Sequence, residues 1–173
     1  MNWMHDWPPD SYLLSPLGSV TFAEMATPLQ TLKTAEGTIL RGRDGNQKPL
    51  SLLPPLTDEE FRRLEASIPC PVPEEARELL QYLRGLEGPS LLRAPHRMLD
   101  RIDVSGLDGG FGLEEIFPHA LSIAGDVCGN FWVIDLNSGS TSWGPIFYAC
   151  HDAPVIAYQT DSLAHFIQEV LRG

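Results

Sequence analysis

The last third of the chain holds four short apolar segments separated by turn-forming residues, and this pattern restricts the possible folds more than any other feature. They are rich in β-branched and aromatic residues, whereas Gly, Asn, Asp and Pro stand between them. Short strands joined by tight connections have this composition, and residues 137–140 form a typical hairpin turn. The pattern predicts an antiparallel meander. Its strands are Ala120–Ala124, Phe131–Leu136, Ile146–Cys150 and Val155–Tyr158.

A helix is predicted to begin at Thr57, which can form a capping box with Glu60. Leu56 and Phe61 flank this box at the positions of a hydrophobic staple. Phe61 is therefore expected in the core, where Phe61→Ala would cost about 3 to 5 kcal/mol. The Pro-Cys-Pro sequence at 69–71 ends this helix.

Two further helices are predicted from apolar residues that recur at helical spacing. One begins at Pro73, ends near Gly85 and Gly88, and buries Ala76, Leu79, Leu80, Leu83 and Leu86. The other closes the chain behind Asp161 and Ser162, and buries Leu163, Phe166, Ile167, Val170 and Leu171. Helices packed mainly on one face of an antiparallel sheet make an α+β fold.

Residues 1–53 carry weaker signals, with strand-like pieces at 20–22 and 38–41 and a turn at 43–46. The Leu-Pro-Pro-Leu sequence at 53–56 interrupts the chain. Because 173 residues suffice for one domain but not for two, we expect an N-terminal extension over 1–53 and one domain over 54–173. Residues 91–118 show no clear period, and four glycines at 105–112 predict a loop there.

The charge of the chain disfavours several classes of partner. Its 12 Lys and Arg residues against 23 Asp and Glu residues give a net charge of −11, which repels nucleic acids and anionic membranes and also favours solubility. The start, MNWMHDWPPD, lacks the basic and apolar regions of a signal peptide. Three widely spaced cysteines do not form a disulfide framework. We therefore expect a cytoplasmic location in a reducing compartment.

No pattern for catalysis, a metal or a cofactor stands out, and the chain is expected not to be an enzyme. Cys150 and His151 are neighbours in a predicted strand, so their side chains point to opposite faces and do not form a nucleophile and base. The remaining histidines lack metal-ligand spacing. The glycine-rich stretch at 125–130 lacks the lysine of a phosphate-binding loop and precedes a strand.

The succession of motifs resembles the SMI1/KNR4 (SUKH) superfamily over about residues 54–173. It consists of two proline-led helices, a Gly-Asp…Gly-Asn turn at 125–130, an aspartate strand at 133–136, a Gly-Pro-aromatic strand ending in His-Asp at 144–152, and an Asp-Ser cap at 161–162. The resemblance implies a non-enzymatic α+β domain. In bacteria it implies an immunity protein that neutralises a cognate toxin by direct contact, and in fungi a regulatory scaffold.

The residues expected to touch a partner are Asp126, Asn130, Trp143, His151 and Asp152. Loops on a rigid sheet are common binding surfaces, and Trp143 in a turn is expected to be exposed, whereas Trp132 is expected in the core. The alternative for Asp126 and Asn130 is that they cap their own turn through side-chain to backbone hydrogen bonds. An acidic protein of this kind suits a basic toxin domain such as a nuclease. A regulatory or scaffold module that binds no toxin is the alternative function.

Overall fold

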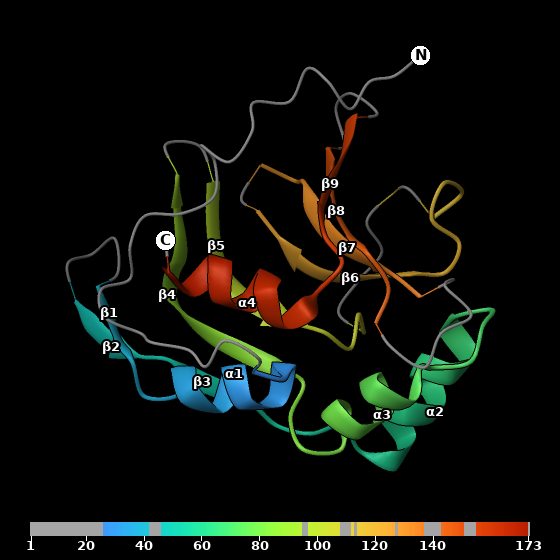
Figure 1. Cartoon of the computed structure of the whole chain (residues 1–173), viewed down its shortest axis with the longest axis horizontal. Coiled ribbons are helices and arrows are strands. Elements are labelled where there is room, and N and C mark those ends of the chain that lie inside the picture. The colour runs from blue at the N-terminus through green and yellow to red at the C-terminus, as the bar shows by residue number, and fades with distance from the viewer. Residues whose placement is uncertain are drawn as a thin grey trace.

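A computed structural model describes residues 26–41, 46–94, 97–107, 112, 114–126, 128–136, 143–150 and 155–172. Within these ranges the chain forms four helices and nine strands, which pair into three antiparallel sheets (Figure 1). The predicted α+β fold is confirmed. None of the helices in this described part is long and apolar enough to cross a membrane.

The predicted meander is present as a four-stranded sheet in the order β6-β7-β8-β9. Trp132 pairs with Tyr148 across β7 and β8, and the register of β6 against β7 shifts between Ser122 and Ala124. The predicted turn at 137–140 lies outside the described residues. The strands are β6 (Ala120–Gly125), β7 (Phe131–Asp135), β8 (Ile146–Cys150) and β9 (Val155–Thr160).

A second, three-stranded sheet occupies sequence that carried no strand signal. It consists of β3 (Ser51–Leu53), β4 (Gly85–Ala94) and β5 (Arg97–Asp103) in the order β3-β4-β5. The prediction that Leu86 belongs to a helix was wrong, because Leu86 pairs with Leu52 and Ile102 within this sheet. The helix ends earlier because the carbonyl of Leu80 accepts the N–H of Leu56. Leu86 is nevertheless fully buried, as predicted.

The three predicted helices are α2 (Asp58–Ser67), α3 (Glu74–Leu80) and α4 (Leu163–Arg172). The capping box is confirmed, since the Thr57 hydroxyl accepts the N–H of Glu60 at 3.2 Å and the Glu60 carboxylate accepts the N–H of Thr57 at 2.8 Å. Ser162 caps α4 by accepting the N–H of His165 at 3.1 Å. Phe61 packs against the core cluster, as predicted, but it is only half-buried.

The N-terminal region contains a helix that the sequence analysis did not predict, α1 (Pro28–Ala35). Thr27 and Gln30 form its capping box, and Pro28 stands at its first position. Beyond it, β1 (Ile39–Arg41) pairs with β2 (Gln47–Pro49) in an antiparallel hairpin. Most of the turn predicted at 43–46, and the strand-like piece at 20–22, lie outside the described residues.

One apolar cluster joins both larger sheets to the helices. Trp132 is fully buried, as predicted. The centre of its ring lies 4.9 Å from the ring centre of Tyr148 and 6.2 Å from that of Phe166 in α4. Figure 1 shows α1 next to α4, where Leu32 and Ala35 are fully buried. Residues of the N-terminal region therefore contribute to the same core as the rest of the chain.

Candidate functional site

Asp126 organises the turn between β6 and β7. Its Oδ1 accepts the N–H groups of Cys128 at 2.8 Å and Asn130 at 2.9 Å, and its Oδ2 accepts the Nδ2–H of Asn130 at 3.0 Å and the hydroxyl of Tyr148 at 2.7 Å. Gly129 completes the turn with a φ of 83°, which side chains disfavour. The capping alternative for Asp126 is confirmed, whereas contact with a partner stays a prediction.

Two opposing effects act on the pKa of the Asp126 carboxyl. Desolvation raises this pKa. The hydrogen bonds from Tyr148, Asn130 and Cys128 together lower it by more than desolvation raises it, so the pKa lies below its usual value. The carboxylate is therefore held in its ionised form by the groups of the turn. Because its four acceptor contacts lie within the chain, Asp126 contributes to the shape of this sheet rim.

His151 and Asp152 lie outside the described residues. Asn130 is 9% exposed, and its side chain is turned toward Asp126. Of the five predicted residues, the structure thus brings Asp126 and Asn130 together at one turn.

Trp143 is 6% exposed, so the prediction that it is an exposed turn residue was wrong. The neighbouring Ser and Gly suggest a turn, but the carbonyl of Pro145 accepts the N–H of Asp135 at 2.9 Å and holds this segment on β7. The approach is so close that a Cβ atom on Gly144 would stand 1.5 Å from the Asp135 carbonyl oxygen. The indole is consequently packed into the core cluster.

The Trp143 segment is also tied to α3. The carboxylate of Glu75 accepts the backbone N–H of Trp143 at 3.3 Å, across 68 positions of sequence. Beside this contact lies a groove of about 580 Å³ between the start of α1, the outer face of α3 and Trp143, which we call the α1–α3 groove. Residues that line it include Pro28, Leu29, Glu75, Glu78, Tyr82 and Trp143.

The α1–α3 groove combines exposed aromatic surface with negative charge. Tyr82 is 63% exposed, and the ammonium group of Lys33 lies 5.8 Å from the centre of its ring. Glu78 is exposed and makes no hydrogen bond or ion pair within the described part of the chain. Among the residues that the structure describes, no Lys or Arg lines the groove. The sequence analysis missed this site because its three walls come from distant stretches, none of which carries a motif.

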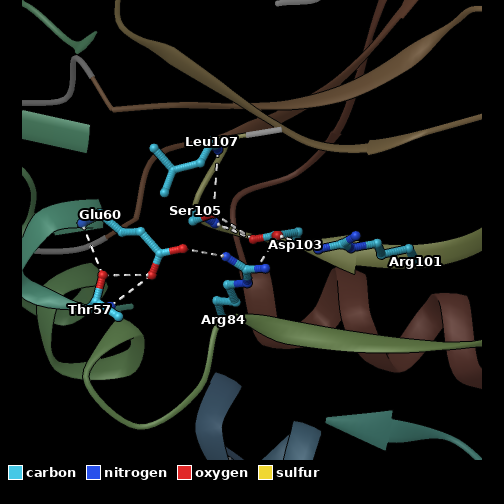
Figure 2. Close-up of polar contacts among 7 residues, drawn as sticks. All are labelled: Thr57, Glu60, Arg84, Arg101, Asp103, Ser105 and Leu107. Atoms are coloured by element: carbon cyan, nitrogen blue, oxygen red, sulfur yellow. Dashed lines mark hydrogen bonds and ion pairs between the residues drawn. The ribbon is translucent and has the colours of Figure 1, made fainter. Parts of the chain in front are cut away.

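A second polar cluster links α2 to the three-stranded sheet (Figure 2). Arg84 lies between the carboxylates of Glu60 and Asp103, at 3.3 Å from each, and Arg101 lies 3.1 Å from Asp103. The pKa of Glu60 is lowered, chiefly by the hydrogen bond from the Thr57 backbone. The cluster thus joins the α2 cap to the end of β5.

Asp103 and Ser105 in this cluster have the composition of a nucleophile and base, but their surroundings argue for a structural role. The Ser105 hydroxyl donates to Asp103 at 2.6 Å and accepts the N–H of Leu107 at 3.4 Å. Ser105 is fully buried, so a substrate has no access to it. Asp103 also accepts the N–H of Ser105 at 3.0 Å, which fixes the turn after β5.

No group of three or more His, Cys, Asp or Glu residues within the described ranges is arranged to hold a metal ion. Cys150 ends β8 and is half-buried rather than buried. Burial raises the pKa of the Cys70 thiol, and the charge of Asp135 adds to this effect, so Cys70 is poorly ionised at neutral pH.

Comparison with known proteins adds one match. The model of the SMI1 / KNR4 family (SUKH-1) matches residues 55–169. This range contains α2, α3, the strands β4 to β9 and most of α4, whereas α1 and β1 to β3 precede it. No curated protein and no solved structure matches the chain.

Proposed function

The chain belongs to the SMI1/KNR4 family (SUKH-1), and from this membership we propose that it is an immunity-type protein that neutralises a cognate toxin by direct protein–protein contact. The family match over 55–169 is the observation that carries the proposal. Membership of this family supports binding rather than catalysis as the proposed mode of action, and a cytoplasmic location is part of the same proposal.

Charge supports a basic partner. The net charge is −11, and Glu59, Glu74 and Glu78 are exposed without an ion pair among the described residues. Exposed carboxylates of this kind accelerate association with a positively charged surface. A nuclease domain has such a surface because its cleft holds phosphate. We propose that the acidic protein covers that cleft and excludes the substrate.

The turn that holds Asp126 and Asn130 remains part of the proposal as a second contact region. His151 and Asp152, which lie outside the described residues, stay predicted contacts. Asp126 would act there through the shape of the turn, because its side chain accepts the N–H groups of Cys128 and Asn130.

Co-expression and binding test the function together. The neighbourhood of the gene is inspected first, and the probe is the toxin domain of a large secreted protein encoded beside it; a gene without such a neighbour would favour the regulatory or scaffold alternative. The domain is produced in a heterologous bacterial host with and without the chain, and the purified pair is examined by calorimetry and size-exclusion chromatography. Restored growth and a stable complex are expected. A folded chain that neither binds the domain nor restores growth would refute the proposal and favour the regulatory or scaffold alternative.

A further inference from the structure

We infer that the α1–α3 groove is the docking site for a basic segment of the partner, one that presents a Lys or Arg side chain beside an apolar residue. This inference rests on the proposed function in that the partner is taken to be the toxin domain. It adds the surface of this chain that binds the partner and the kind of partner segment that is bound.

The lining of the groove matches such a segment in charge. Glu75 and Glu78 contribute carboxylates, and no cationic side chain lines the groove among the described residues. Lys33 stands at the edge, over Tyr82, so two negative charges face one positive charge. A cationic side chain entering the groove therefore meets net negative charge, whereas an acidic segment is repelled.

The aromatic and apolar surface matches the rest of a Lys or Arg side chain. Tyr82 is 63% exposed even though Lys33 lies 5.8 Å from the centre of its ring, so aromatic surface stays open to a cation of the partner. Pro28, Leu29 and Leu79 add apolar surface, which suits the aliphatic stem of Lys or Arg and a neighbouring apolar residue.

The walls of the groove are held in place before any partner arrives. Glu75 accepts the N–H of Trp143, and α1 is fixed by its capping box and by the burial of Leu32 and Ala35. A preformed groove loses little conformational entropy on binding. Because α1 precedes the family match, this wall is suited to distinguish one toxin from another on a shared scaffold.

Variants of the full chain test the groove against the toxin domain defined above. Glu78→Lys is expected to weaken binding by about tenfold or more, since it places a positive charge in the groove. The variant should fold, because Glu78 is exposed in the last turn of α3, where a cation is favourable. Tyr82→Ala should weaken binding about fivefold to tenfold through loss of the aromatic face.

Glu115→Lys is the matched control, because Glu115 is exposed in the turn before β6 and does not line the groove. It makes the same change in net charge and should alter binding by about twofold or less. If wild type binds the toxin domain and Glu78→Lys and Tyr82→Ala bind equally well, the groove is refuted while the proposed function stands. Equal weakening by Glu78→Lys and Glu115→Lys would likewise refute the groove, since net charge alone would explain it.

A second experiment does not depend on the toxin. The peptide acetyl-Gly-Arg-Leu-Arg-Gly-amide is titrated into the isotope-labelled chain, and the indole N–H signals are followed by NMR, with Trp143 assigned from Trp143→Phe. We expect a saturable shift at Trp143, little change at the buried Trp132, and no shift with the peptide in which Glu replaces Arg. No shift with the Arg peptide, or equal shifts with both, would overturn the inference. A selective shift without toxin binding would instead leave the groove intact and refute the proposed function.

Discussion

Substitution of Asp126 by Asn tests whether the rim of the four-stranded sheet depends on one ionised carboxylate. Asn keeps the size of the side chain and one carbonyl oxygen, but it replaces the other oxygen with an NH₂ group. The retained oxygen can still accept the N–H groups of Cys128 and Asn130. The new NH₂ group faces two donors, the Tyr148 hydroxyl and the Asn130 amide. The Tyr148 hydroxyl can rotate to accept, whereas an amide NH₂ group cannot.

The expected loss of stability follows from these contacts. A hydrogen bond to a charged group contributes about 1.5 to 3 kcal/mol, and the lower end applies because Asp126 is only half-buried. One such bond is lost and the others become bonds to a neutral group. We expect Asp126→Asn to lower the free energy of unfolding by about 2 to 3 kcal/mol, measured by urea denaturation with tryptophan fluorescence at about pH 7.

The pH dependence has a defined sign. The pKa of Asp126 in the folded chain is lowered from its usual value of 3.8, so its stabilisation is fully present above that value and is lost as the pH falls through the lowered pKa. The difference in stability between wild type and Asp126→Asn should be constant near neutral pH and should shrink below 3.8. The lowered pKa of Glu60 cancels in this difference because both proteins contain Glu60.

Tyr148→Phe provides the control for this reasoning. It removes one donor to Asp126 and should cost about 1.5 kcal/mol. In a double-mutant cycle, the two substitutions should be coupled by about 1 kcal/mol because they share one hydrogen bond. Additive effects, or a difference between wild type and Asp126→Asn that does not change between neutral and acidic pH, would refute the argument that the carboxylate holds the turn.

Three further predictions concern the core, a close backbone approach and the cysteines. Phe61→Ala should cost about 1 to 2 kcal/mol of stability, less than the sequence alone indicates, because Phe61 is half-buried. Leu64→Ala, at a fully buried position, should cost about 3 to 5 kcal/mol, and urea denaturation of both variants checks this order. Gly144→Ala should yield little folded protein by circular dichroism, because the added Cβ would stand 1.5 Å from a carbonyl oxygen of β7. Cys128→Ser and Cys150→Ser should each retain toxin protection in the co-expression assay with a modest loss of stability, and loss of protection by a stably folded Cys150→Ser protein would revive a catalytic role.

The sequence predicted the elements whose signals are local. The meander has alternating strands and turn residues, and the starts of α2 and α4 are encoded by side chains at Thr57 and Ser162 that bond to N–H groups three residues on. The helix α1 carries the same kind of signal in Thr27, Pro28 and Gln30 and was predictable from the capping box. Its buried face contains Pro28 and Thr31 beside Leu32 and Ala35, so a search for strongly apolar residues at helical spacing does not find it.

The strands β4 and β5 were not predictable from local pattern because their pairing depends on partners elsewhere. Leu86 has the spacing of a helical residue, but the N–H of Leu56 already occupies the Leu80 carbonyl, and β3 pairs with the chain from Gly85 onward. The competition between one more helical turn and a third strand is decided by these long-range hydrogen bonds. Periodicity correctly identified Leu86 as buried, since both alternatives place it in the core.

The α1–α3 groove was even less predictable from local sequence patterns than β4 and β5. Its surface joins residues 27–29, 75–82 and 143, and the contact that closes it, from Trp143 to Glu75, spans 68 positions. An exposed Tyr82 and an unpaired Glu78 are unremarkable in the sequence and acquire meaning only when α1 is packed beside them. A family scaffold can therefore keep its core while the residues around such a groove change, and the identity of the partner then depends on side chains that leave the fold unaffected. Under the proposed function, substitutions at Glu78 and Tyr82 should alter which toxin is bound before they alter whether the protein folds.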